Sequence, residues 1–305
     1  MHARPTWHMT ALSGGRMGHH ARMDQRSLPT MRSKRLGSEL RRLRGDRNLT
    51  VSDVAKRLGC GQPKISQIEN GNRGIRAGDL STLLDLYGVV DGKYRQRLRK
   101  LAVDVYKVDW WTQQGPLIDA LRDYLTLESD SGLVRVYEPT LVPGMLQTEA
   151  YMRQLFTERL PADQVDALVD TRLKRKELLD DHLGFRLRAV VDEPALHRIM
   201  GTRATVAEQL RYLERVGRRP NVTVQVLPLK ARLAVDQFAA FSLFTFRGQS
   251  SIDVAWLEYL TGGTLLEQES DVQAYARAWE ELTAAALSPS DSRRLICALI
   301  EENES

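Results

Sequence analysis

The first third of this chain is organised around residues 49–71, which read LTVSDVAKRLGCGQPKISQIENG. Thr50 is a good N-cap for a helix, because its hydroxyl can accept a hydrogen bond from an amide of the first turn. The apolar stripe that follows at helical spacing consists of Val51, Val54, Ala55 and Leu58. Gly59 suits the left-handed residue that ends such a helix, and Pro63 is tolerated in the first turn of the next one. The stretch therefore predicts two short helices joined by a tight turn.

The second of these helices, expected from Gln62, has one apolar face and one polar face. Ile65 and Ile68 are three residues apart and must point inward together. The opposite face then carries Gln62, Pro63, Ser66 and Gln67. Glutamine can pair bidentately with adenine, and serine can donate or accept, so this face is suited to the major groove of DNA. Asn70 closes the helix, and Arg73 in the following loop offers a cation to a phosphate.

These features resemble the phage-repressor, or xenobiotic-response-element (XRE), family of helix-turn-helix regulators. The residues that carry the resemblance are Leu40, Leu43, Arg44, Leu49, Thr50, Val54, Ala55 and the segment Ile65-Ser66-x-Ile68-Glu69-Asn70-Gly71. The resemblance implies an internal ion pair between Arg44 and Glu69 that locks the first helix of the domain to the recognition helix. The residues expected to contact DNA, from the resemblance and from their own chemistry, are Thr50, Gln62, Pro63, Lys64, Ser66, Gln67, Asn70 and Arg73. A plain helical hairpin without a DNA role is the structural alternative.

Charge is divided unevenly along the 305 residues. Residues 1–100 contain 21 Lys and Arg against 8 Asp and Glu, whereas the remainder contains 23 against 31. A basic first third followed by an acidic remainder suits a protein that meets nucleic acid through one end. Cys60 and Cys297 have no metal-ligand spacing and indicate no disulfide framework. No apolar run approaches the length of a membrane span and no signal peptide is evident, so we expect a cytoplasmic protein.

The chain divides into three parts by composition and periodicity. Residues 1–35 lack apolar periodicity, and we expect a disordered basic N-terminal arm there. Residues 36–105 predict five helices, which would form an all-α helix-turn-helix DNA-binding domain. Residues 106–305 alternate helical patterns with strand-like runs, so we expect a larger mixed α/β domain with a central sheet. The expected fold class is therefore α+β, and the order of the strands stays open.

The second domain resembles the C-terminal effector domain of a group of actinobacterial, antitoxin-like regulators. The segments that carry this resemblance are Tyr137-Glu138-Pro139, Val142 to Thr148, Arg172 with Arg175, Asp192-Glu193-x-x-Leu196, Gln209-Leu210 and Val224 to Pro228. Such regulators are often encoded beside a small protein, so the resemblance implies a protein partner. Met145 and Lys176 depart from the leucine and the glutamine that are usual at these places.

Two sets of polar residues in the second domain are candidates for a site. The residues expected to line a polar effector or partner cleft are Tyr137, Gln147, Arg172 and Arg175. The arginines would suit an anion, but the same residues can equally serve to join a loop to the helix behind it. Glu193 and His197 share a helix face, yet no second histidine accompanies them. We therefore expect no metal, no cofactor and no enzyme activity.

Sequence-specific DNA binding by a transcriptional regulator is the function that these features predict. The recognition helix, at about residues 62–70, would enter the major groove, and the second domain would receive a regulatory signal. We expect a homodimer, because helix-turn-helix dimers match two-fold operators. The alternative is an antitoxin-like protein-interaction module that neutralises a small partner protein and binds DNA secondarily.

Overall fold

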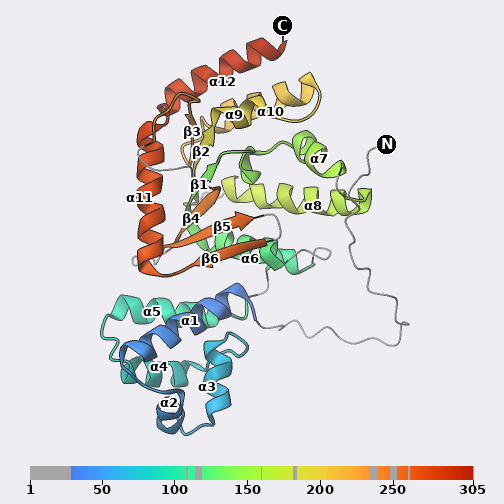
Figure 1. Cartoon of the computed structure of the whole chain (residues 1–305). Helices are drawn as coiled ribbons and strands as arrows, with labels where there is room; N and C mark the ends of the chain where they lie inside the picture. The colour runs from blue at the N-terminus through green and yellow to red at the C-terminus, as the bar shows by residue number, and fades with distance from the viewer. Residues whose placement is uncertain are drawn as a thin grey trace, which may run out of the picture.

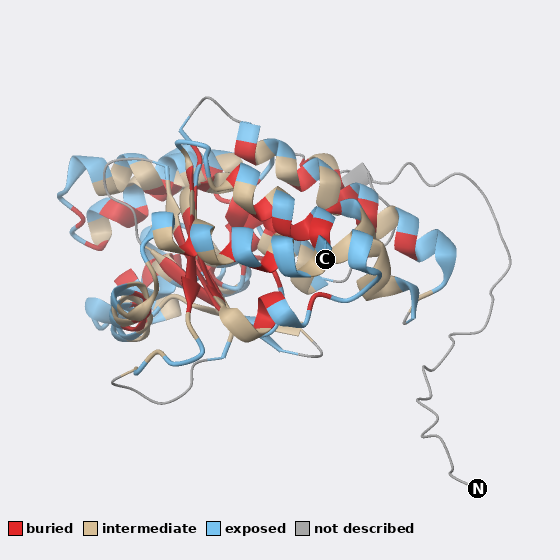
Figure 2. Cartoon of the chain, turned by 90° about the horizontal axis from the view of Figure 1, so that it is seen from above, coloured by how far each residue is buried: buried red, intermediate tan, exposed pale blue. Residues whose placement is uncertain are grey.

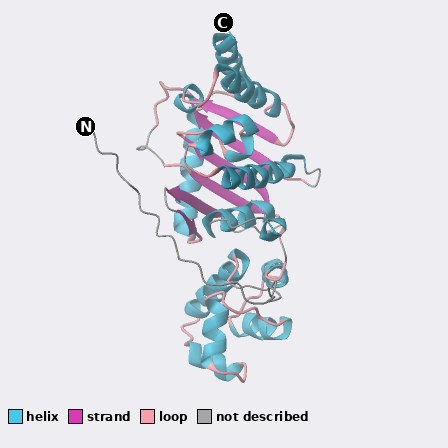
Figure 3. Cartoon of the chain, turned by 90° about the vertical axis from the view of Figure 1, so that its right-hand side faces the viewer, coloured by secondary structure: helices cyan, strands magenta, loops and turns pink. Residues whose placement is uncertain are grey.

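The computed structural model describes residues 29–107, 109–113, 119–158, 160–180, 184–233, 239–247, 253–259 and 262–304. Within these ranges, the first part of the chain is helical and the second combines helices with one sheet (Figure 1). Figure 3 shows the strands gathered in the larger part only, with the smaller helical part below it. The expected fold class, an all-α domain followed by a mixed α/β domain with a central sheet, is confirmed.

The first part holds the predicted pair of short helices within a small bundle. Its helices are α1 (Met31–Asp46), α2 (Val51–Arg57), α3 (Gln62–Glu69), α4 (Ala77–Leu86) and α5 (Gly92–Asp104). Thr50 caps α2: its hydroxyl accepts a hydrogen bond from the amide of Asp53 at 3.1 Å, and the Asp53 carboxylate accepts one from the Thr50 amide at 2.9 Å. Gly59, with φ at 63°, turns the chain toward α3. The apolar residues of α2 and α3 pack with those of α1 and α4 in one core, which includes Leu40, Val54, Ile65, Ile68, Leu80 and Leu84.

Helix α1 begins earlier than the sequence pattern indicates. Its N-cap is Thr30, and Met31, Arg32 and Ser33 in its first turn are buried. Residues 31–35 therefore belong to α1 and not to the expected disordered arm, because contacts with distant parts of the chain order this turn. Residues 1–28 of that arm lie outside the described residues.

The second part is built on a sheet whose described strands run in the order β3-β2-β1-β4-β5-β6. The strands are β1 (Ser131–Glu138), β2 (Arg186–Asp192), β3 (Val222–Leu227), β4 (Phe241–Phe246), β5 (Val254–Tyr259) and β6 (Gly262–Leu266). The pairs β1–β2 and β2–β3 are parallel, whereas β1–β4, β4–β5 and β5–β6 are antiparallel. Helical segments join β1 to β2 and β2 to β3, as parallel pairing requires. The antiparallel pair β1–β4 is formed by strands that are distant in the sequence.

Helices cover both faces of this sheet. They are α6 (Asp119–Asp130), α7 (Glu149–Thr157), α8 (Ala162–Arg175), α9 (Glu193–His197), α10 (Arg203–Val216), α11 (Glu269–Ala285) and α12 (Pro289–Glu304), with short 3-10 turns at Trp110–Gln113, Gly144–Leu146 and Lys176–Asp180. Val134 and Val136 face a core shared with α10 and α12, whereas the neighbouring Tyr137 faces a second core with Trp279 of α11. The buried residues of the central strands accordingly appear as red ribbons between the helices in Figure 2, whereas β6 at the edge has no buried residue. Among the described residues, no helix combines the length and apolar character needed to cross a membrane.

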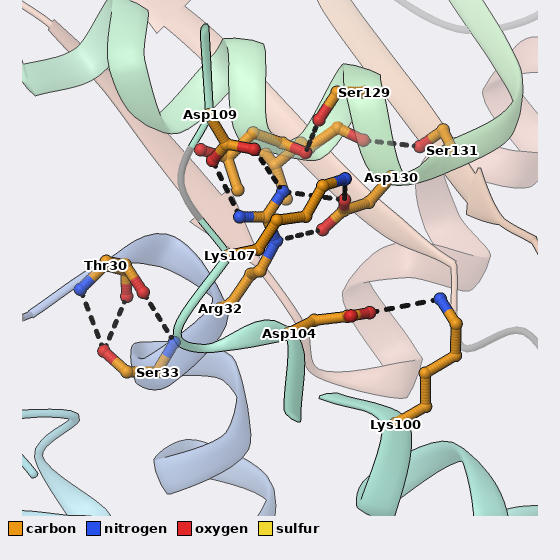
Figure 4. A network of polar contacts seen from close by, with 12 residues as sticks. Thr30, Arg32, Ser33, Lys100, Asp104, Lys107, Asp109, Ser129, Asp130 and Ser131 are labelled. Carbon is orange, nitrogen blue, oxygen red and sulfur yellow. Dashed lines mark hydrogen bonds and ion pairs between the residues drawn. The ribbon is translucent and has the colours of Figure 1, made fainter. Parts of the chain in front are cut away.

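A buried ionic network joins the two parts of the molecule (Figure 4). The guanidinium of Arg32 donates to both carboxylate oxygens of Asp109 at 2.7 and 2.9 Å and to both oxygens of Asp130 at the same two distances. Asp109 lies in the connection after α5, and Asp130 ends α6. Both carboxylates raise the pKa of Arg32 against the effect of its burial. The first turn of α1 is thereby fixed to the larger domain.

Candidate nucleic-acid interface

The polar face expected on the second helix is exposed on α3. Ile65 and Ile68 are 1% and 2% exposed, so they hold the helix against the core of the small domain. The residues on the opposite side are more open: Gln62, Pro63 and Gln67 are exposed and Ser66 is partly exposed. Helix α3 belongs to the small helical part, which lies at the end of the molecule opposite α12 (Figure 1). This arrangement leaves the hydrogen-bonding groups of these side chains available to base edges.

An ion pair between Arg44 and Glu69 connects α1 to the end of α3. Arg44 donates from Nε and Nη2 to the two carboxylate oxygens of Glu69, at 2.7 and 2.9 Å. Its Nη1 also donates to the carbonyl of Leu49 at 2.8 Å, just before α2. Glu69 is 5% exposed, and its hydrogen bonds raise the pKa of Arg44. The pair that the resemblance implies is therefore formed, and it connects α1, the start of α2 and the end of α3.

The other residues expected to contact DNA differ in exposure and in whether their side chains already have a partner within the protein. Thr50 and Arg73 are exposed, and Thr50 also donates its hydroxyl to Asp53 at 2.6 Å. Lys64 is directed toward α4, because its amine pairs with the Asp79 carboxylate at 2.7 Å. A phosphate would have to compete with that carboxylate for the Lys64 amine. Asn70 is exposed, and its side-chain oxygen accepts a hydrogen bond from α1.

The donor to Asn70 is Arg41, a residue that was not included among the expected DNA contacts. Arg41 is half exposed and also donates to the carbonyl of Glu69 at 3.1 Å. The guanidinium thus lies at the end of α3, where it orients the Asn70 amide and adds positive charge. Its spacing of three residues from Arg44 puts both arginines on one face of α1, and this is the sequence signal that could have identified it.

The cleft expected in the second domain is not formed as a single site. Arg172 donates to Gln147 at 2.9 Å, and Gln147 donates to the carbonyl of Val142 at 2.8 Å. Arg175 pairs with Glu128 in the interior, and Tyr137 donates to Asp192 at 3.2 Å on the opposite side of the sheet. The residues whose side chains are buried are Tyr137, Gln147 and Arg175. The four side chains therefore do not line one cleft in the described structure: Arg172 binds Gln147, whereas Arg175 and Tyr137 bind Glu128 and Asp192 elsewhere.

The one pair with metal-ligand spacing also has a simpler role. His197 Nε2 lies 3.7 Å from Glu193 Oε1 on α9. The other carboxylate oxygen of Glu193 accepts a hydrogen bond from the amide of Leu229 at 2.7 Å. Glu193 therefore joins the start of α9 to the connection after β3. Among the described residues, no group of three or more His, Cys, Asp or Glu is arranged to hold a metal ion.

Burial changes the acidity of Arg172 beside Gln147. The pKa of its guanidinium is lowered to about 10, because it is removed from water and faces the positive charge of Arg175. Its Nε is buried without a hydrogen-bond partner among the described residues. The Arg172 side chain also lies over the ring of Phe156, 4.7 Å from the centroid. These contacts connect α8 to α7, and Arg172 is a partly buried residue with partners inside the domain.

Comparison with known families assigns the two parts of the chain separately. A family model described as a helix-turn-helix domain matches residues 35–98. A second model, described as a domain of unknown function (DUF5753), matches residues 121–297, more than half of the chain. No curated protein and no solved structure matches the chain significantly. The first match implies DNA binding, and the second leaves the activity of the larger domain open. The chain belongs to the DUF5753 family and carries a helix-turn-helix domain of the XRE type before the domain that defines this family.

Proposed function

We propose that the protein is a sequence-specific transcriptional regulator that reads DNA with the outward face of α3. The observation that carries this proposal is the exposure of Gln62, Ser66 and Gln67 on a short helix whose other face is buried. Their groups match the donors and acceptors that base edges present in the major groove. The Arg44–Glu69 pair would fix the angle at which this helix enters the groove.

Recognition would divide between phosphate contacts and base contacts. Arg73 and Arg41 lie near the end of α3 and would hold the DNA backbone, which positions the protein without reading sequence. Gln67 and Gln62 would then read bases. We further propose a homodimer, because a two-fold operator presents two equal half-sites to such a helix.

The larger domain would receive the regulatory signal in this proposal, and we assign it no catalytic step. It follows a basic region and makes up nearly all of residues 101–305, which contain 31 Asp and Glu against 23 Lys and Arg. The second candidate is an antitoxin-like interaction module, favoured by the resemblance of this domain to that group. In that case the acidic domain would bind a small partner protein, and DNA binding would be secondary. A steep decrease of DNA affinity with salt supports the first candidate, because it marks engagement of phosphates.

Substitution of Gln67 and Arg73 tests the proposal directly. An operator would first be selected from random duplexes with the purified full-length protein. We expect Gln67→Ala to weaken binding to that operator by about 1 to 3 kcal/mol and to leave random DNA nearly unaffected. We expect Arg73→Ala to weaken both duplexes similarly and to reduce the salt slope by about 1.

Fluorescence anisotropy at several salt concentrations measures both effects. Gln96→Ala is the matched control, because Gln96 is an exposed glutamine on α5, outside the expected interface. The control should bind both duplexes like the unmodified protein. Equal losses on operator and random DNA for both test variants would contradict the assignment of α3 as the reading helix.

A further inference from the structure

A surface hollow of about 370 Å³ lies in the larger domain, between the start of α7, the end of α8 and α10. These three helices lie on the same side of the sheet in Figure 1. The residues that line the hollow include Thr148, Lys176, Arg211, Tyr212 and Arg215, together with the carboxylates of Glu149 and Glu208. Its volume is in the range of pockets that hold small molecules. Its lining residues all belong to the larger domain, and it adjoins Gln147, whose side chain binds Arg172.

Lys176 is the most enclosed cation of this hollow. Its amine donates to the carbonyl of Gln147 at 2.6 Å and lies 4.0 Å from the centre of the Tyr212 ring. Within the part of the chain that the structure describes, no carboxylate forms an ion pair with it. Two donor positions of the ammonium therefore stay available. Burial, with the positive charges of Arg215 and Arg219, lowers the pKa of Lys176 to about 8.

Arg215 supplies a second cation beside the same ring. Its guanidinium carbon is 5.5 Å from the centre of Tyr212, and among the described residues no carboxylate forms an ion pair with it. Its neighbours differ in this respect, since Arg211 pairs with Glu304 and Arg219 pairs with Asp180. Lys176 and Arg215 are thus two cations next to one aromatic ring, without the counter-charge that their neighbours have.

The carboxylates of the hollow do not supply that counter-charge. Glu149 pairs with Arg153 at 2.8 Å on the surface of α7. Glu208 is exposed, and its attraction for Lys176, together with that of Asp180, does not offset the burial of the amine. An incoming anion would therefore meet two uncompensated cations, with the Thr148 hydroxyl nearby.

We propose that this hollow binds a small oxyanion, a phosphate or a carboxylate group, between Lys176 and Arg215. The ammonium would bind it as a compact point charge, and the guanidinium would offer paired donors to two oxygens. The anion would favour the charged form of Lys176, so binding should weaken as the pH rises above about 8. This proposal concerns the larger domain alone and holds whether or not α3 reads DNA.

The test is titration calorimetry of the full-length protein with inorganic phosphate and, separately, with acetate, at constant ionic strength in chloride buffer. We expect saturable binding of at least one ion, with about one site per chain. Lys176→Gln and Arg215→Gln should each weaken it about tenfold or more, because each removes a charged hydrogen-bond donor. Binding of phosphate alone would assign the hollow to phosphate esters, and binding of acetate alone would assign it to carboxylates.

Arg203→Gln is the matched control, because it removes one positive charge at the exposed start of α10, outside the hollow. The control should bind like the unmodified protein. Arg215 is exposed, so we expect Arg215→Gln to fold normally. This variant therefore tests the site even if Lys176→Gln perturbs folding. The proposal is overturned if neither ion binds saturably, or if Arg215→Gln and Arg203→Gln have the same affinity as the unmodified protein.

Discussion

Substitution of Gly37 by alanine tests whether α1 fixes the position of the recognition helix through direct backbone contact. A Cβ atom at Gly37 would lie 2.6 Å from the carbonyl oxygens of both Ile68 and Glu69. These oxygens belong to the backbone, so no side-chain rotation can relieve the contact. The helices would have to separate by about 0.8 Å to reach ordinary van der Waals distance, which begins near 3.4 Å. We expect the end of α3 to move and the Arg44–Glu69 hydrogen bonds to lengthen.

The magnitude follows from comparison with Gly45, a second glycine of α1. Alanine at Gly45 would meet nothing within 4 Å. Both substitutions gain helix propensity, up to about 1 kcal/mol for Gly to Ala. Only Gly37→Ala also overpacks the contact between α1 and α3, which costs about 1 to 3 kcal/mol. The difference in unfolding free energy between the two variants therefore isolates the backbone contact and should be about 1 to 3 kcal/mol.

Urea unfolding followed by circular dichroism at 222 nm measures this difference, and anisotropy with the selected operator measures its effect on DNA binding. Gly37→Ala should unfold at lower urea concentration than Gly45→Ala and bind the operator more weakly. Gly45→Ala should keep the affinity of the unmodified protein. If the two variants are equally stable and bind equally well, the close packing of α1 on α3 does not control the reading helix.

Two further substitutions test buried charges. Arg32→Met removes the shared partner of Asp109 and Asp130, and we expect it to lower the free energy of unfolding by about 3 kcal/mol in urea. Arg42→Met is the control, because Arg42 is exposed on the same helix, and it should change this free energy by less than about 1 kcal/mol. If the two substitutions lower the free energy of unfolding by similar amounts, the Arg32 network does not stabilise the fold as proposed. Burial and Glu258 raise the pKa of Glu138 from 4.5 to about 8. The folded state thus retains a proton that the unfolded chain releases. The free energy of unfolding should therefore decrease as the pH rises from about 5 to about 8. Glu138→Gln should lose less stability across this range, and an unchanged slope would contradict the assignment.

The helix-turn-helix region was predictable from sequence because its determinants are local. The Thr50 cap, the turn at Gly59 and the three-residue spacing of Ile65 and Ile68 act within a few residues of one another. Each feature favours the same pair of helices, and the fold of the small domain agrees with all of them. The exposed face of α3 follows from that spacing alone.

The expected polar cleft shows where sequence reasoning stops. Tyr137 and Arg172 both lie in segments that carry the resemblance to the regulator group. However, Tyr137 packs on the face of the sheet covered by α11, and α8 lies on the other face (Figure 1). The pairing of strands decides this, and neighbouring strands come from distant parts of the sequence. The hollow at Lys176 depends on the same long-range arrangement, because Arg215 is brought beside it only by the packing of α10.

The start of α1 was assigned too late for a related physical reason. Apolar periodicity identifies Leu36 and Leu40, which pack in the core of the small domain. Met31 packs instead in the core of the larger domain, and Arg32 is held by carboxylates at Asp109 and Asp130. One helix thus contributes to two cores, and a boundary drawn from periodicity after residue 35 cuts off the turn that joins them.

That first turn also contacts the segment that follows α3. Ser33 donates its hydroxyl to the carbonyl of Gly71 at 2.7 Å, directly after α3, while the preceding residue, Arg32, is bound to Asp130 of the larger domain. The two contacts come from adjacent residues of one helical turn, so the segment that ends α3 and the corner that ends α6 share a rigid support. A movement of the larger domain relative to α3 must therefore either break the Arg32 network or displace this turn and its Ser33 contact with Gly71.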